Sequence, residues 1–228
     1  MLALKLGMSI GGSNRPMGAS WTPASEGIDL VAWYKNQVGI TLNGSDVSAW
    51  ADSSSNSFDM VQATASKQPA YNGGDIEFTS ADTQNLQSAS DITLSGAFTV
   101  GMKLEPDALN LAVIGSNNQP SEFLKIMSSE ALRISTDGSL VDLSLDEGTF
   151  IADINLVLTR NASNLITLYI NGVAQADTET LSGTADINAI GVRRTDNNPY
   201  DGTISEIQIY RSTSAELTAN INTYLSTL

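Results

Sequence analysis

Alternation of apolar and polar side chains along short runs constrains the fold of this chain more than any other feature. Residues 203–210 show it most clearly, with one face expected to carry Ile204, Glu206, Gln208 and Tyr210 and the other Ser205, Ile207 and Ile209. A period of two residues is that of a β-strand, because successive side chains point to opposite faces of a sheet. The pattern therefore predicts strands.

Similar runs recur from residue 28 onward and are separated by turn-forming residues. They cover residues 28–34, 75–79, 98–104, 111–114, 123–126, 132–135, 140–145, 154–159, 165–170, 187–192 and 203–210. Asn171 and Gly172 follow one run, and an Asn-Gly pair favours a hairpin turn because both residues tolerate positive φ. Ser, Thr and Asn, which compete with helix formation, make up more than a quarter of the chain. We predict an all-β fold, a two-sheet antiparallel jelly-roll sandwich.

One short helix is expected near the C-terminus, over residues 213–226. Thr213 and Glu216 fit a capping box, with Thr213 as the N-cap. Leu217, Ile221 and Leu225 follow at a spacing of four residues and would form one apolar face. We expect this face to pack on the sandwich. The residues expected to be buried between the two sheets are Trp33, Phe78, Phe98, Leu168 and Ile207.

Residues 1–27 have no sustained period and contain several Gly and Pro residues, so we expect an extended N-terminal arm preceding a single domain at 28–228. Leu2, Leu4 and Leu6 would share one strand face. Together with Trp21 they are candidate partner-binding residues, because large apolar side chains are costly to leave in water. The alternative is a free terminus that contacts nothing.

The amino-acid composition excludes several classes of function. The chain has no His and no Cys, which excludes Ser-His-Asp and Cys-His catalysis, imidazole or thiolate metal sites, and disulfides. It has 11 Lys and Arg against 25 Asp and Glu, a formal net charge of −14. Because such a surface repels polyanions, we expect no nucleic acid and no anionic membrane as partners.

The sequences at the two ends of the expected sandwich resemble those of a known family. Residues 30–34, 39–42, 47–53 and 63–69, together with 200–210 and the helix that follows, resemble the concanavalin A-like lectin/glucanase (laminin G-like) domains. In that family a small residue enters the penultimate strand, the strand ends in Tyr, and a helix closes the domain. The resemblance implies a jelly-roll sandwich, but it does not imply one activity, because this fold carries many functions.

A narrower resemblance concerns the N-terminal segment. Residues 1–7, followed by Trp21-Thr22-Pro23 and then this domain, resemble structural proteins of tailed bacteriophages, especially the contractile-tailed phages of cyanobacteria. The resemblance implies a virion component attached through its arm, with other virion proteins or further copies of the chain as partners. It does not say whether the protein belongs to the head, tail or fibre.

Glucanases of the resembled family carry an E-x-D-x-x-E motif on one strand. The nearest match is Glu105, Pro106 and Asp107, with Asn110 in place of the last carboxylate. Pro106 would also remove a ladder hydrogen bond from a central strand, so we interpret the segment as a loop. We therefore expect no catalytic residues and no enzymatic activity.

The remaining candidates are binding residues. Tyr200, beside Asn197, Asn198 and Asp201, is the best cluster for a carbohydrate, since an aromatic ring in a polar turn can stack on a sugar. Asp52, Ser54 and Asn56 have the spacing of a calcium loop but lack its Gly and Glu, so we predict no metal site and no cofactor, with calcium left as an alternative. Arg193-Arg194 could bind phosphate or form salt bridges.

Two functional hypotheses follow. The first is a non-enzymatic structural or accessory protein of a tailed-phage virion, a sandwich held on the particle through its arm. The alternative is a carbohydrate-binding module that recognises host surface glycans. The two are compatible, and a hydrolase is the least favoured interpretation.

Overall fold

In the computed structural model the described residues are 20–118, 123–137, 139–146 and 149–228. Leu2, Leu4 and Leu6 lie outside them. The strands are β1 Leu30–Tyr34, β2 Ile40–Asn43, β3 Asp46–Trp50, β4 Met60–Val61, β5 Ala70–Tyr71, β6 Ile76–Phe78, β7 Leu86–Ser95, β8 Phe98–Pro106, β9 Leu111–Gly115, β10 Phe123–Ser128, β11 Ala131–Thr136, β12 Ser139–Ser144, β13 Ile154–Arg160, β14 Leu165–Ile170, β15 Val173–Thr180, β16 Thr184–Ile190 and β17 Gly202–Tyr210. The helix α1 spans Ala215–Leu225, and short 3₁₀ turns lie at Pro23–Asp29, Ala65–Lys67 and Ser80–Asp82.

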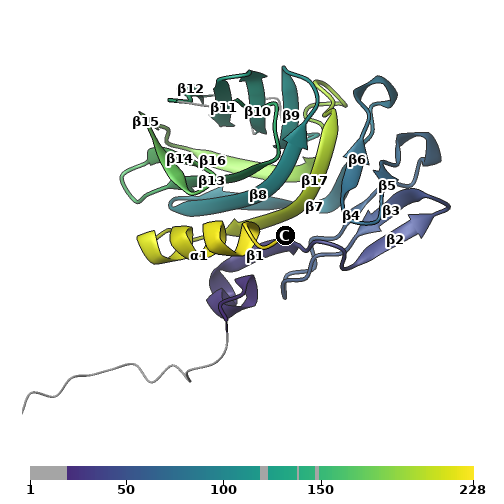
Figure 1. The fold of residues 1–228 in the computed structure, drawn as a ribbon, viewed down its shortest axis with the longest axis horizontal. Helices are drawn as coiled ribbons and strands as arrows, with labels where there is room; N and C mark the ends of the chain where they lie inside the picture. Colours follow the sequence, from purple (N-terminus) through teal and green to yellow (C-terminus); the bar gives the residue numbers. More distant parts are fainter. Residues whose placement is uncertain (1–19, 119–122, 138, 147–148) are drawn as a thin grey trace, which may run out of the picture.

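The strands pair antiparallel and form two layers (Figure 1). The first, which we call the helix-covered sheet, has the order β1-β17-β8-β13-β14-β15. The second sheet has the order β2-β3-β4-β7-β16-β9-β10-β11-β12. The short strands β5 and β6 join the layers, because β5 pairs with β3, and β6 pairs with both β5 and β17. The predicted antiparallel sandwich is confirmed.

The main hydrophobic core lies between the two sheets. Phe78, Phe98, Leu168 and Ile207 are buried in it, as predicted. Trp33 is buried too, with 6% of its surface exposed, but it belongs to a second cluster between the helix-covered sheet and α1. The prediction that Trp33 lies between the sheets was therefore wrong. Its strand neighbours Ala32 and Tyr34 point into the main core, so alternation turns Trp33 outward.

Strand β17 contains a bulge that the apolar pattern did not predict. Its pairing with β8 shifts register between Ile204 and Glu206. Ile204 consequently points into the main core with Ile207 and Ile209, rather than sharing a face with Glu206. A bulge inserts one residue on one strand and moves the preceding side chains to the opposite face.

The bulge leaves Glu206 buried on the side of the helix-covered sheet that faces α1. Its carboxylate accepts hydrogen bonds from Trp33 Nε1, from the backbone N–H of Asn36 at 2.7 Å and from Gln208 Nε2 at 2.9 Å. Burial raises the pKa of Glu206, and these hydrogen bonds oppose that shift. The carboxylate therefore satisfies the indole N–H of Trp33, which would otherwise be an unpaired donor in an apolar layer.

The C-terminal helix is present, but its cap differs by one residue from the prediction. Ser214 is the N-cap, and its Oγ accepts from the N–H of Leu217 at 3.0 Å. Leu217, Ile221 and Leu225 are buried against the helix-covered sheet. In the described part of the chain, no helix is long and apolar enough to cross a membrane.

The chain begins to pack on the domain before residue 28, where the sequence predicted the domain to start. Trp21, which the sequence analysis placed in the arm, is half-buried, and its ring meets Tyr224 of α1 edge-on at 6.1 Å between centroids. Its Nε1 donates to Glu26 at 2.6 Å. Trp21 is thus partly covered by its own domain, because the 3₁₀ turn that follows it brings the chain under the helix. The remaining residues expected to bind a partner lie outside the described residues.

Candidate functional site

The structure corrects the proposed role of Tyr200 as an exposed aromatic platform. Tyr200 is 0% exposed. Its ring packs edge-on against Phe78, with centroids 5.9 Å apart, and its hydroxyl donates to the backbone oxygen of Thr203 at 3.2 Å. A sugar cannot stack on this ring. The turn-like sequence around Tyr200 gave no sign of Phe78, which is distant along the chain.

The other members of that cluster separate into two environments. Asn197 and Asn198 lie in a loop that follows β16, whereas the carboxylate of Asp201 accepts from the hydroxyl of Ser80 and stays with β17. The side chain of Asn198 donates to the backbone oxygen of Asn110 at 3.1 Å and accepts from Arg193 Nε at 3.0 Å. Asn198 therefore holds the loop in place, and Asp201 secures the turn at Ser80.

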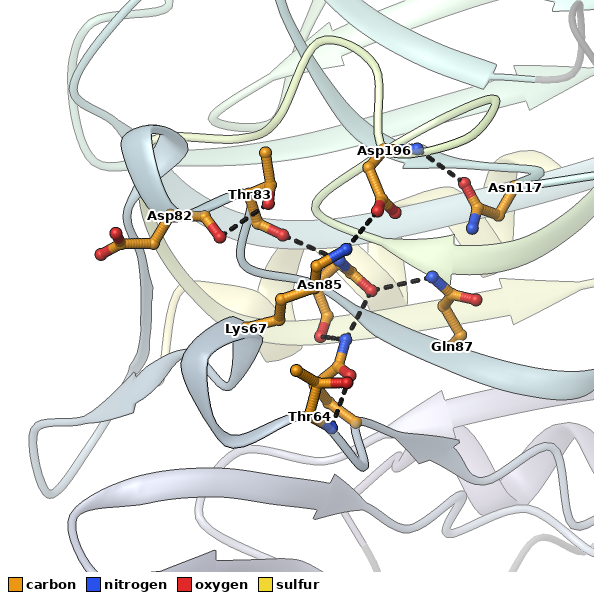
Figure 2. Close-up of polar contacts among 9 residues, drawn as sticks. Thr64, Lys67, Asp82, Thr83, Asn85, Gln87, Asn117 and Asp196 are labelled. Atoms are coloured by element: carbon orange, nitrogen blue, oxygen red, sulfur yellow. Dashed lines mark hydrogen bonds and ion pairs between the residues drawn. The ribbon is translucent and has the colours of Figure 1, made fainter.

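The loop of residues 193–198 folds back along β9. The N–H of Arg194 donates to the Ser116 oxygen at 2.8 Å, and the N–H of Ala112 donates to the Asn198 oxygen at 2.8 Å. The N–H of Asp196 donates to Asn117 Oδ1 at 3.0 Å (Figure 2). These bonds hold the loop against the second sheet.

A hydrogen-bonded network of buried amide side chains adjoins the loop of residues 193–198. Asn85, which is fully buried, accepts at Oδ1 from Gln62 Nε2 and from Gln87 Nε2, both at 2.9 Å. Gln62 Oε1 accepts from the N–H of Thr64 at 3.0 Å, and Asn85 Nδ2 donates to the Thr83 oxygen at 2.8 Å. A satisfied buried network of this kind fixes its side chains in one arrangement.

Four half-buried side chains lie above this network: Lys67, Gln87, Asn117 and Asp196, which we call the polar patch (Figure 2). Lys67 and Asp196 form an ion pair of 2.5 Å, and the N–H of Asn85 donates to the Lys67 oxygen at 3.1 Å. Among the described residues, the side chain of Gln87 forms hydrogen bonds only through Nε2, and that of Asn117 only through Oδ1. Gln87 Oε1 and Asn117 Nδ2 therefore remain able to bind a ligand.

An open groove of about 520 Å³ follows β4 and β7 beside the polar patch. It is lined by Ser57, Asp59, Val61, Gln87, Ser88, Ala89 and Ser90. Its lining mixes apolar surface with the side chains of Ser57, Asp59, Gln87, Ser88 and Ser90, and it carries no aromatic ring. A saccharide in this groove would be held by hydrogen bonds to side chains and backbone rather than by stacking.

The loop with calcium-like spacing does not fit a calcium site. Both carboxylate oxygens of Asp52 accept protein donors, Oδ1 from the N–H of Trp33 at 2.9 Å and Oδ2 from the Ser54 hydroxyl at 2.7 Å. Asn56 Nδ2 donates to the Val31 oxygen at 2.8 Å. The loop therefore binds to β1. Across the described residues, no three acidic side chains gather where they could hold a metal ion.

The incomplete glucanase motif lies partly on a strand rather than in a loop. β8 continues through Glu105 to Pro106, which pairs with Gly202 at the end of the ladder. Asp107 follows the strand, and its N–H donates to the Asp201 oxygen at 2.9 Å. Asn110 has a φ of 64° in the turn before β9, so the three positions do not continue along one strand.

Comparison with known proteins agrees with this architecture. The family described as the concanavalin A-like lectin/glucanases superfamily matches residues 72–218, well over half of the chain. The chain belongs to the concanavalin A-like lectin/glucanase superfamily. A search of curated protein sequences gives no match.

Solved structures of this superfamily fold resemble the chain at low sequence identity. The binding domain of Paraclostridial Mosquitocidal Protein 1 aligns with a TM-score of 0.59 and 14% identity over 87% of this chain and 52% of that one. The binding domain of botulinum neurotoxin serotype D/C aligns with a TM-score of 0.59 and 12% identity, over 90% of this chain and 53% of that one. The chain thus spans about half the length of these toxin domains.

A third solved structure aligns over nearly all of its own length and over most of this chain. It is domain 4 of AbnA, an extracellular arabinanase from Geobacillus stearothermophilus, in complex with arabinotriose. The TM-score is 0.54 and the identity 17%, over 85% of this chain and 98% of that domain. These similarities show that the chain shares its fold with these three domains.

Proposed function

We propose that the protein is a non-catalytic carbohydrate-binding module, and that the polar patch with its adjoining groove is the binding surface. One observation carries the proposal: Gln87 is oriented by the buried Asn85 and Asn117 by the backbone N–H of Asp196, and each keeps hydrogen-bonding atoms unused among the described residues. Amides fixed in this way lose little conformational entropy when they bind the hydroxyl groups of a sugar. The arabinotriose complex of a domain with the same fold supports the ligand class.

Binding to a glycan array by the full chain tests this function. We expect selective retention of a defined saccharide and no release of reducing ends from it. Gln87→Ala and Asn117→Ala should each weaken binding roughly twofold to tenfold, the range of one lost hydrogen bond. Asn220→Ala is the matched control, because Asn220 is a half-buried amide on α1, on the opposite face. Absence of any retained glycan, or equal affinities for all three variants, would contradict the proposal.

We further propose that the module is carried on a tailed-phage virion, where it binds host glycans and contacts other virion proteins or copies of itself. The resemblance of residues 1–7 and 21–23 to phage structural proteins supports this setting. Trp21 contacts Tyr224, so a truncation should stop before it. Deleting residues 1–19 should leave the thermal midpoint unchanged and abolish incorporation into particles. Normal incorporation of the truncated chain would place the attachment surface on the sandwich instead.

A further inference from the structure

Strand β7 leaves its pairing with β16 where it borders the groove. The register shifts between Ile187 and Ala189, so that residues 88–91 of β7 lie opposite Asn188 alone. On the other side, β4 pairs with β7 at Gln87. We call residues 88–91 the β7 bulge, and the first three of them line the groove. Because the extra residues of a bulge leave the ladder, their backbone N–H and C=O groups can bind other partners.

The buried amide of Asn188 anchors the β7 bulge. Its strand neighbour Ile187 points into the main core, so Asn188 points to the outer face of the sheet, where it is nevertheless only 4% exposed. Asn188 Nδ2 donates to Asp91 Oδ1 at 2.7 Å, and Asn188 Oδ1 accepts from the backbone N–H of Asn117 at 2.8 Å. One side chain therefore fixes both the end of the β7 bulge and the backbone of Asn117 in the polar patch.

The groove offers partners for both the apolar and the polar surface of a sugar. Val61 is 47% exposed and Ala89 is also exposed, so both can contact the C–H groups of a sugar ring. The hydroxyls of Ser88 and Ser90, together with the backbone of the β7 bulge, can exchange hydrogen bonds with sugar hydroxyl groups. The groove volume of about 520 Å³ lies within the range of about 300–1,000 Å³ usual for small-molecule sites.

The charges at the groove disfavour an acidic ligand. Asp59 lines the groove and Asp91 ends the β7 bulge, and within the described ranges neither carboxylate forms an ion pair. Each accepts a hydrogen bond from a neutral donor, Asp59 from the N–H of Asp52 at 2.9 Å and Asp91 from Asn188. No cationic side chain is among the described residues that line the groove. An anionic sugar there would meet two carboxylates and no counter-charge.

We propose that the groove, the β7 bulge and Asn117 form one site for a neutral oligosaccharide, and that Asn188 positions them relative to one another. The inference rests on the proposed carbohydrate function and specifies its ligand as uncharged. A bulge already fixed through Asp91 loses little conformational entropy when its backbone binds sugar hydroxyls. Loosening the bond between Asp91 and Asn188 therefore weakens binding without removing a contact to the sugar.

Calorimetric titration of the full chain with neutral oligomers of arabinose, galactose and glucose tests the site. At least one of them should bind. Asp91→Ala should weaken that binding about threefold to tenfold, the range of one lost hydrogen bond, although Asp91 is exposed and does not line the groove. Asp91→Asn should keep the wild-type affinity, because the amide oxygen of the replacement can still accept from Asn188.

Asp177→Ala is the matched control. Asp177 lies on β15, at the edge of the helix-covered sheet, and likewise accepts one backbone hydrogen bond, from the N–H of Ser144 at 2.8 Å. This variant should bind the neutral oligomer as the wild type does. Unchanged affinity in Asp91→Ala, or equal losses in Asp91→Ala and Asp91→Asn, would overturn the positioning role.

An oligomer of galacturonic acid of equal length tests the specificity. At low ionic strength it should bind about fivefold or more weakly than the best neutral oligomer, because Asp59 and Asp91 repel its carboxylates. Equal or tighter binding of the acidic oligomer would overturn the assignment of a neutral ligand.

Hydrogen exchange of the free protein separates this inference from the proposed function. The backbone N–H of Asn117 donates to Asn188, so it should exchange faster in Asp91→Ala than in the wild type or in Asp91→Asn. If it does so while no glycan binds, the link through Asn188 stands and the carbohydrate function fails. If a neutral glycan binds through Gln87 and Asn117 without any effect of Asp91→Ala, the function stands and this inference fails.

Discussion

Replacing Gly202 with alanine should lower the free energy of unfolding by about 3–5 kcal/mol. Gly202 has a φ of +131°, a conformation that residues with a Cβ rarely adopt. A Cβ there would lie 2.2 Å from the backbone oxygen of Glu105 and 2.8 Å from Pro106 Cα. Gly202 also pairs with Pro106 of β8 and with Phe78 of β6, so the neighbouring backbone cannot move without breaking one of these ladders. Urea denaturation measures the loss.

Gly44→Ala separates the two causes of that loss. Gly44 also has a positive φ, of +69°, but nothing lies within 4 Å of the position of its Cβ. Gly44→Ala should therefore lower the free energy of unfolding only by the cost of placing a Cβ at positive φ, about 1–2 kcal/mol. Equal losses in the two variants would show that the close approach of the strands around Gly202 does not constrain the fold.

Replacing Phe98 with alanine should lower the free energy of unfolding by about 3–5 kcal/mol. Phe98 is buried in the main core and borders an internal void of about 30 Å³, which the truncation would enlarge. Its ring also lies 4.7 Å below the guanidinium of Arg160, a buried cation whose pKa is lowered by desolvation. Alanine would remove that contact as well.

Phe98→Leu is the control for volume. It keeps most of the buried apolar surface and should lose about 1–1.5 kcal/mol. Thermal and urea unfolding of both variants measure the difference. A loss below about 1 kcal/mol for the alanine variant would show that the site can collapse around the missing ring.

The fold could be predicted from the sequence because strand periodicity is local, but particular residues depended on distant contacts. The bulge between Ile204 and Glu206 is set by pairing with β8. The sequence could not reveal it, because the residues before and after the bulge each alternate as a strand does. Thr213 and Ser214 offer the same hydroxyl chemistry, so only the backbone decides which one caps α1. Tyr200 is buried by Phe78, which a turn-like local sequence could not reveal.

The candidate site was less accessible to sequence reasoning. Arg193 and Asn198 were recognisable as candidates from the sequence, and both take part in the loop that organises the site. Lys67 and Gln87 were not recognisable, because Lys67 meets Asp196 across 129 residues of chain and the role of Gln87 depends on the buried Asn85.

The positions of Trp21 and α1 determine how the module can be tethered. The chain enters the domain at Trp21, which touches Tyr224 close to the point where the chain leaves it, on the outer side of the helix-covered sheet. The polar patch lies at the second sheet, with Gln87 on β7 and Asn117 just after β9. Anything fused to either end is therefore anchored behind the sandwich, and the ligand-facing side points outward. Such a geometry would let many copies on one scaffold engage a glycan-coated surface at the same time.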